Sequence, residues 1–300
     1  MDRHRILIVG VGELGRTLGK HTAVRGHEVF LWDIDRTKTV ERRPVHELAE
    51  LADIVFLCVP SWAIRSVVSD IGAVVRSSAI VAAFSKGLDV ALGVTTGELL
   101  PQLLPKSQPF VVIGGPMLAE EIAAGRHAAA VFASPEKRAA ETVAAIFESK
   151  IFQAELSRDV HSVALAGVLK NIYALGLGIS DGLGLGENTK GWLVARAIRE
   201  MLRIGDALQG DREILLGTAG LADLVATGYS VSSRNRGVGH EIARTGKCAI
   251  KSEGMASLPP LMMRLDGRTG EFPLLGAIKE VVIDCKPAAE AMQAYLAKKD

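Results

Sequence analysis

The sequence predicts an α/β protein whose first half forms a doubly wound parallel sheet and whose second half is all helical. In the first half, short apolar runs rich in β-branched residues alternate with helical patterns, whereas only long helical patterns follow residue 155. Runs that are almost continuously apolar are typical of parallel strands covered by helices on both faces. With 48% hydrophobic residues among 300, each half can bury a sizeable core.

Six apolar runs are the expected strands, in the order RILIVG, HEVFLWD, DIVFLCVP, AIVAAFSKG, FVVIGGP and AAAVFAS. Helical patterns are expected at Val45–Ala52, Glu136–Glu148, Val160–Ile179 and Thr189–Leu208. We place the two domains at residues 1–155 and 156–300. Because no Pro/Ser-rich linker separates them, we expect a broad interface that contains a cleft.

The composition excludes several classes of partner. The 35 basic and 34 acidic residues give a formal charge of +1, so no general attraction to nucleic acid or to a membrane is expected. Cys58, Cys248 and Cys285 lack metal-ligand spacing and fit a reducing compartment. The histidines form no metal-binding pattern, and no uninterrupted apolar run approaches the ~20 residues of a membrane helix. We expect a cytoplasmic protein without a metal.

A glycine-rich turn follows the first expected strand directly. In ILIVGVGELGRTLG, Gly10, Gly12 and Gly15 have the G-x-G-x-x-G spacing that binds a dinucleotide in a Rossmann-type domain. The first glycine permits a tight turn, the second lets a pyrophosphate approach, and the third lets the helix pack on the strand. Glu13 and Leu14 lie within this turn and complete the expected cofactor loop. The alternative is a strand–turn–helix without a ligand.

An acidic residue ends the second expected strand. In FLWDID, Asp33 occupies the position where a carboxylate accepts hydrogen bonds from an adenosine ribose. Such a carboxylate would repel a 2′-phosphate, so we hypothesise NAD rather than NADP. Arg36 and Lys38 follow closely and could accommodate that phosphate, which keeps NADP as the alternative.

Two further strands end in groups suited to a ligand. Lys86 follows Ser85 at the carboxyl end of AIVAAFSKG, where open α/β sheets bind ligands. Gly115, in IGGPMLAEE, lies in a turn that exposes backbone N–H groups. A solvated loop lysine and a purely geometric glycine turn are the alternatives.

The helical half places charges among apolar residues. Lys170 lies within LAGVLKNIYALGLG and Asp223 within GLADLVA, and a buried charge is costly unless it is paired. A desolvated lysine beside a carboxylate can exchange a proton with a substrate oxygen. The alternative is a lysine whose ammonium extends to water along an apolar surface.

A polar segment, SSRNR, follows in the same half. Arg234 offers a planar fork of donors suited to a phosphate, and Asn235 can add hydrogen bonds. Without further context the segment is equally consistent with a polar surface loop.

The motifs together resemble the NAD(P)-dependent glycerol-3-phosphate dehydrogenase family over nearly the whole chain. GVGELG, FLCVPS, FSKG, GGPMLAEE, LKNIYALGLGISDGLGLGENTKG, GLADLVATGYS and SSRNR occur in the family's order. The resemblance implies reduction of dihydroxyacetone phosphate to sn-glycerol 3-phosphate with a nicotinamide cofactor. It also implies a homodimer.

The resemblance also implies residue roles. Lys170 corresponds to the general acid/base, Asp223 to the second-domain aspartate, and Lys86 to a lysine that touches substrate and cofactor. Arg234 and Asn235 correspond to the pair that grips the substrate phosphate. Further implied substrate contacts are Gly115, Asn171, Thr227 and Ser233, and further implied cofactor contacts are Ala119, Arg234 and Glu253.

The chain departs from the family pattern near the cofactor. Glu13 and Leu14 stand where an aromatic residue is usual, and the connection RTKTVERRPVH after the second strand is shorter than in the family. Met117 replaces a serine of many bacterial members, and Lys251 replaces an apolar residue.

Two other functions are alternatives to the dehydrogenase. A 3-hydroxyacid dehydrogenase of the hydroxyisobutyrate or 6-phosphogluconate type also combines a Rossmann domain with a lysine-bearing helical domain, but a carboxylate substrate needs no second-domain phosphate clamp. A catalytically silent NAD(H)-binding sensor would have little reason to retain Lys170, Asp223 and Arg234 together.

Overall fold

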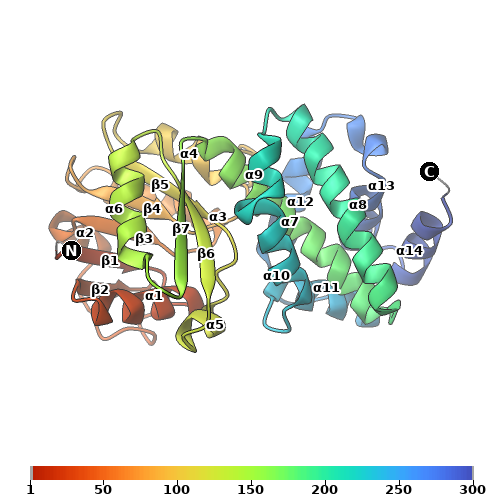
Figure 1. Ribbon diagram of the computed structural model, residues 1–300, viewed down its shortest axis with the longest axis horizontal. Coiled ribbons are helices and arrows are strands. Elements are labelled where there is room, and N and C mark those ends of the chain that lie inside the picture. Colours follow the sequence, from red (N-terminus) through yellow and green to blue (C-terminus); the bar gives the residue numbers. More distant parts are fainter. Residues whose placement is uncertain (1–2, 299–300) are drawn as a thin grey trace.

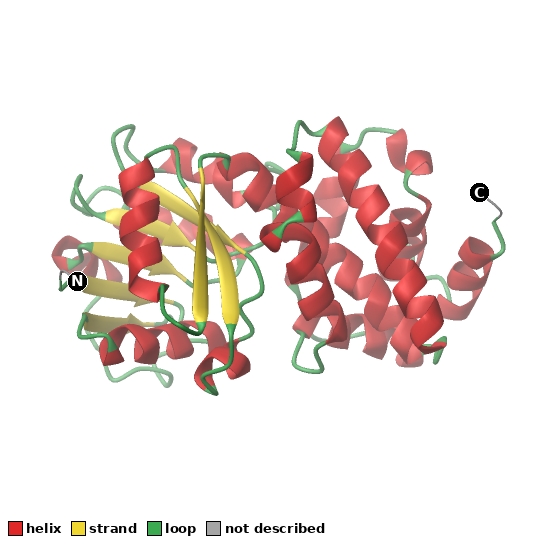
Figure 2. Ribbon diagram, viewed as in Figure 1, coloured by secondary structure: helices red, strands yellow, loops and turns green. Residues whose placement is uncertain are grey.

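The computed structural model describes residues 3–298. The chain folds into a half that contains the sheet and a half that is helical (Figures 1 and 2). One seven-stranded sheet has the order β2-β1-β3-β4-β5-β6-β7. The strands are β1 (Arg5–Val9), β2 (Glu28–Trp32), β3 (Ile54–Leu57), β4 (Ile80–Ala83), β5 (Phe110–Gly114), β6 (Ala128–Ala133) and β7 (Phe152–Ser157). Figure 2 shows that all of these strands lie in the first half.

Helices cover both faces of this sheet. They are α1 (Glu13–Val24), α2 (Val45–Leu51), α3 (Ser61–Ile71), α4 (Thr96–Leu103), α5 (Ala119–Ala123) and α6 (Lys137–Phe147). Successive strand residues enter two different cores: Leu7 and Val55 belong to one, and Ile6 and Ile54 to the other. This burial on both faces explains the almost continuous hydrophobicity of the strands, and it confirms the predicted fold class.

Two features of the sheet were not predicted. β6 pairs with β5 in the antiparallel direction, whereas the remaining pairs are parallel. Hydrophobic patterning reports burial and not strand direction, so this reversal left no signal. β7 was missed because Gln153 and Glu155 interrupt its apolar residues. It lies at the sheet edge, where a strand is not fully covered.

The second half is helical, as predicted. Its α-helices are α7 (Val160–Gly182), α8 (Gly186–Ala207), α9 (Arg212–Leu216), α10 (Asp223–Tyr229), α11 (Arg234–Thr245), α12 (Glu253–Arg264), α13 (Pro273–Val282) and α14 (Ala288–Leu296). A π-helical turn, Thr218–Ala222, precedes α10, and a 3₁₀ turn, Arg268–Glu271, precedes α13. The predicted domain boundary, between residues 155 and 156, falls within β7.

α7 forms the centre of the helical half. Its length and hydropathy would allow it to cross a membrane, but the whole apolar window is buried within the protein. Burial of this kind is typical of the core helix of a globular domain. The helix therefore holds Lys170 and Asn171 inside the protein rather than at its surface.

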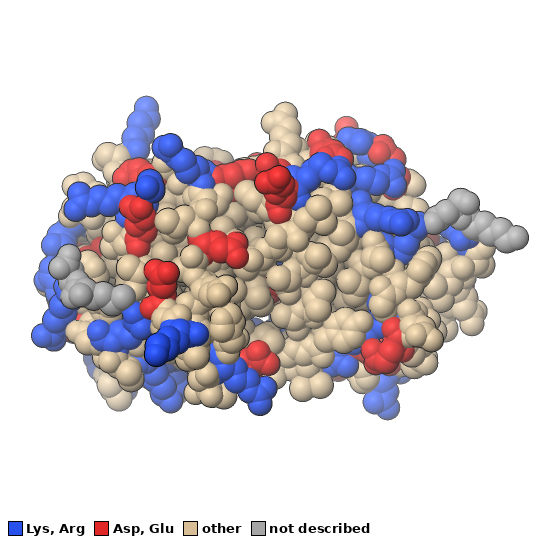
Figure 3. Space-filling model, in the orientation of Figure 1, with Lys and Arg blue, Asp and Glu red and all other residues tan. Residues whose placement is uncertain are grey.

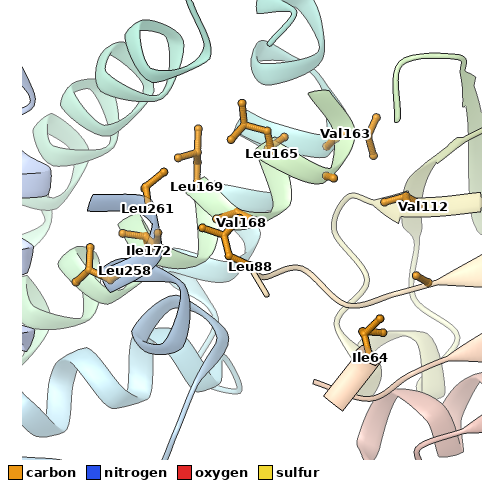
Figure 4. Close-up of a cluster of buried hydrophobic side chains, with 14 of the residues drawn as sticks. Ile64, Leu88, Val112, Val163, Leu165, Val168, Leu169, Ile172, Leu258 and Leu261 are labelled. Atoms are coloured by element: carbon orange, nitrogen blue, oxygen red, sulfur yellow. The ribbon is translucent and has the colours of Figure 1, made fainter. Parts of the chain in front are cut away.

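The two halves share a hydrophobic core. Figure 4 shows Ile64 of α3 and Val112 of β5 on the sheet side, with Val163 and Val168 of α7 and Leu258 of α12 on the helical side. All five belong to one buried cluster. The expected close packing between the halves is therefore present, and it holds the ends of β4 and β5 against α7.

Candidate active site

The glycine-rich loop between β1 and α1 has the geometry of a dinucleotide site. Gly10 has a φ of +99°, and a Cβ there would lie 2.7 Å from the Cys58 carbonyl oxygen. A Cβ on Gly15 would lie 1.9 Å from the Gly10 carbonyl oxygen, so α1 packs against the turn only with glycine at this position. A Cβ on Gly12 would meet nothing within 4 Å. The middle glycine is thus open to a ligand.

A hollow of about 390 Å³ lies beside this loop and brings several predicted cofactor residues together. It is lined by Val11, Gly12, Glu13, Arg16, Thr17, Lys38, Ala119, Glu120 and Ala123. The start of α1 has no side-chain cap, so its first N–H groups suit a pyrophosphate. Leu14 is half-buried and packs on the core beneath. The residues therefore fit a dinucleotide.

A larger hollow, of about 700 Å³, is less suited to the predicted chemistry. It lies beside the amino-terminal ends of the strands, next to His4, His27 and Asp53. None of the predicted site residues lines it. Open α/β sheets bind ligands at the carboxyl ends of their strands, so the smaller hollow is the better candidate.

Asp33 anchors the glycine-rich loop. Its Oδ2 accepts a hydrogen bond from the Val11 N–H at 2.7 Å, and its Oδ1 accepts one from the Asp35 N–H at 2.9 Å. The Lys38 ammonium lies 3.7 Å from the same Oδ1. The carboxylate is buried, and its hydrogen bond to Val11 fixes the loop; it is not among the residues that line the hollow.

Two lysines from different halves meet on one carboxylate. Lys170 Nζ donates to Asp223 Oδ1 at 3.0 Å and to Thr227 Oγ1 at 2.8 Å. Lys86 Nζ donates to Asp223 Oδ2 and to the Gly115 carbonyl oxygen, both at 2.6 Å. Five predicted site residues are therefore joined in one network. Sequence reasoning paired Lys170 with Asp223 but did not anticipate that Lys86 shares the carboxylate.

Burial sets the protonation of this network. It lowers the pKa of Lys170 to about 8, although the Asp223 carboxylate acts in the opposite direction. Burial also acts to raise the pKa of Asp223, but the charges of Lys170 and Lys86 outweigh it and hold that pKa below its ordinary value. Lys170 is 6% exposed and does not extend to water. A lysine that titrates near neutrality can exchange a proton with a substrate.

A chain of amides extends the network toward α12. Asn171 Nδ2 donates to the Lys86 carbonyl oxygen at 2.8 Å, and Asn235 Nδ2 donates to Asn171 Oδ1 at 2.7 Å. The Gly254 N–H then donates to Asn235 Oδ1 at 2.9 Å. These bonds hold the segment that follows β4 and the helices α7, α11 and α12 in a fixed mutual arrangement.

Arg234 begins α11 next to this amide chain. It is exposed, and within residues 3–298 its side chain has no hydrogen bond or ion pair. Ser233 caps the helix, because its Oγ accepts from the Arg236 N–H at 3.3 Å. The guanidinium is therefore available to an anion, whereas the serine hydroxyl already has a structural partner.

Glu253 joins the two halves at the other side of the site. Its Oε1 accepts from the Ser61 N–H at 2.8 Å and its Oε2 from Ser61 Oγ at 2.6 Å, so it caps α3 of the sheet half. Burial raises the pKa of Glu253. Beside it, Lys251 Nζ lies 4.3 Å from the centroid of the Trp62 ring. Sequence reasoning missed Ser61, although the FLCVPS motif ends on it.

Comparisons with known proteins agree in both halves. Two family models match, described as NAD-dependent glycerol-3-phosphate dehydrogenase N-terminus over residues 39–140 and C-terminus over residues 159–293. The glycine-rich loop and Asp33 lie outside the matched ranges. The first match begins at Thr39, in the connection between β2 and α2.

Relatives of known sequence and structure cover nearly the whole chain. Glycerol-3-phosphate dehydrogenase [NAD(P)+] of Chlorobium chlorochromatii is 33% identical over 96% of each chain, and that of Geobacter metallireducens is 30% identical over 96% of this chain and 95% of its own. The crystal structure of a glycerol-3-phosphate dehydrogenase from Coxiella burnetii has a TM-score of 0.89 at 26% identity, covering 99% of both chains. A 3-hydroxyisobutyrate dehydrogenase from Mycobacterium tuberculosis reaches a TM-score of 0.55 at 13% identity, a likeness of fold alone.

Proposed function

The chain belongs to the NAD-dependent glycerol-3-phosphate dehydrogenase family, and we propose that it interconverts dihydroxyacetone phosphate and sn-glycerol 3-phosphate with Lys170 as the general acid/base. The observation that carries this assignment is the buried Lys170–Asp223–Lys86 network where the two halves meet. A lone buried lysine would be costly, whereas this one is paired and titrates near neutrality. The cofactor is NAD or NADP, as in the relatives.

Each member of the network has a distinct task in reduction. A nicotinamide cofactor held at the glycine-rich loop would supply the hydride for the substrate C2. Lys170 donates a proton to the carbonyl oxygen on that carbon and takes it back during oxidation. Asp223 holds the ammonium of Lys170, and Thr227 fixes its direction through the 2.8 Å hydrogen bond. Lys86 and Asn171 place the substrate against the sheet half.

The phosphate end of the substrate is held by α11. Arg234 supplies a guanidinium without another partner among the described residues, and Asn235 lies beside it. A small substrate fixed at its charged end presents its carbonyl in one orientation, which can contribute several kcal/mol to lowering the barrier. Ser233, at the start of α11, and Gly115, whose carbonyl oxygen accepts from Lys86, are further substrate contacts in this proposal.

The cofactor rests on Gly10, Gly12, Glu13, Leu14 and Gly15. Further contacts come from Ala119, Lys86, Arg234 and Glu253. The Asp33 carboxylate favours NAD over NADP, because its negative charge would repel the 2′-phosphate of NADP. Comparison of the Michaelis constants for NADH and NADPH tests this, and a clear preference for NADPH would overturn it.

The activity itself is tested by NADH oxidation with purified protein. We expect rapid oxidation of NADH with dihydroxyacetone phosphate and little with unphosphorylated dihydroxyacetone, because Arg234 holds the substrate through its phosphate. Turnover of 3-hydroxyisobutyrate with NAD would instead favour the hydroxyacid dehydrogenase. NADH binding without turnover of either substrate would favour the sensor. We also propose a cytoplasmic location and a homodimer, the latter measurable by light scattering.

A further inference from the structure

A third hollow lies on the helical half and shares no residue with the proposed active site. It has a volume of about 450 Å³, within the range of small-molecule pockets. Its walls come from α8 and from the starts of α9 and α13. The lining residues are Arg196, Arg199, Glu200, Leu202, Arg203, Arg212 and Pro273.

The lining of this hollow, which we call the arginine hollow, is strongly basic. Arg196, Arg199 and Arg203 are spaced three and four residues apart, so they share one face of α8. Arg212 joins them from α9. Four arginines against one glutamate give the lining a formal charge of +3, in a chain whose total is +1. Over the upper part of the helical half, Figure 3 shows Lys and Arg side chains with Asp and Glu side chains among them.

Two of these guanidinium groups, those of Arg199 and Arg203, form no ion pair within the described part of the chain, whereas Arg196 has an interaction of its own. Arg212 pairs with Asp206 at 2.6 Å, but within residues 3–298 Arg199 has no hydrogen bond or ion pair. Arg203 lies over the Phe272 ring, with its guanidinium carbon 5.6 Å from the centroid. Like charges on one helix face repel, so this grouping costs stability unless an anion is bound.

The glutamate of the arginine hollow already has other partners. Glu200 is 4% exposed, and its Oε1 accepts from the Leu274 N–H at 2.7 Å. Its Oε2 accepts from the Leu275 N–H at 2.9 Å and from the Tyr173 hydroxyl at 2.8 Å. The carboxylate therefore holds α7, α8 and α13 together at the base of the hollow, where it forms no hydrogen bond to an arginine among the described residues.

We propose that the arginine hollow binds a small phosphorylated anion with several negative charges, at a site separate from the cleft. Guanidinium groups match phosphate oxygens with two parallel hydrogen bonds, and several such groups favour a polyphosphate over a monocarboxylate. The volume admits a molecule larger than a single phosphate. The side chains of Leu202 and Pro273 add an apolar surface against which an organic part can pack.

The test is calorimetric titration of the full-length protein with inorganic tripolyphosphate. We expect binding that weakens at least tenfold in Kd in Arg199→Ala/Arg203→Ala. The matched control is Arg244→Ala/Lys247→Ala, which removes the same charge from an exposed part of α11 and its following loop. Binding should be unchanged in this control and in Arg234→Ala, because the latter alters only the cleft.

Three outcomes would overturn the proposal: unchanged binding in Arg199→Ala/Arg203→Ala, equal loss in the control pair, or loss confined to Arg234→Ala. Dihydroxyacetone phosphate reduction is measured on the same samples. Turnover that persists while tripolyphosphate binding is lost separates this site from the proposed function. Thermal melting of each variant confirms that it is folded.

Discussion

Replacing Asp223 with asparagine removes the charge that lies between two ammonium groups. Its oxygens lie 3.0 Å from Lys170 Nζ and 2.6 Å from Lys86 Nζ. At an effective dielectric constant of about 20, the attraction to Lys170 amounts to about 5 kcal/mol, or about 4 pKa units. Asparagine still accepts a hydrogen bond, and carboxylate partners shift pKa values by about 1–3 units in practice. We therefore expect the pKa of Lys170 to fall by about 1–3 units from its value of about 8.

The assay is the pH dependence of kcat/KM for dihydroxyacetone phosphate reduction. The general acid must be protonated, so the wild-type rate falls as pH rises through about 8. In Asp223→Asn the fall should begin at lower pH, and a two-unit shift would cost about tenfold at pH 7. Asp284→Asn makes the same change in a surface pair with Lys279 and should leave the midpoint unchanged. An unshifted midpoint in Asp223→Asn would refute the electrostatic argument.

Other predictions concern single groups of the site. Lys170→Ala should lower kcat about 10²–10⁴-fold with little change in KM, and retained turnover would exclude the acid/base role. Oxidation of glycerol 3-phosphate should accelerate as pH rises through about 8, because Lys170 must then accept a proton; a flat profile would contradict this. Arg234→Ala should raise KM for dihydroxyacetone phosphate about 10–100-fold and spare dihydroxyacetone, and equal effects on both would argue against phosphate binding. Gly254→Ala should lower the free energy of unfolding by about 1–3 kcal/mol, because the added Cβ would lie 2.3 Å from the Asn171 carbonyl oxygen. An unchanged melting temperature would mean that α7 and α12 can move apart at little cost.

The fold was largely accessible from the sequence because burial on both faces leaves continuous apolar runs. β7 was not predicted, because it lies at the sheet edge and its exposed Glu155 interrupts the apolar run. The antiparallel direction of β6 was not predicted, because strand direction depends on the path of the chain between strands and hydrophobicity does not report that path.

Site residues could be predicted from the sequence where a charged side chain lies among apolar residues, because burying an unpaired charge costs free energy. Lys170 and Asp223 stood out as charges among apolar neighbours, and pairing them required only electrostatics. The bonds from Asn171 to the Lys86 carbonyl oxygen and from Ser61 to Glu253 could not be predicted in the same way. They join segments far apart in the chain, and each of these polar side chains could have hydrogen-bonded to many other groups.

The Lys86–Asp223 contact bears on how such enzymes can be recombined. Lys86 follows β4, in the part of the chain that would be exchanged to alter cofactor preference, while its carboxylate partner begins α10. A chimera that imports a foreign nucleotide-binding half therefore also imports one side of the proton-transfer machinery. Cofactor preference and chemistry are not separable modules in this chain, and viable hybrids must inherit compatible lysine and aspartate segments together.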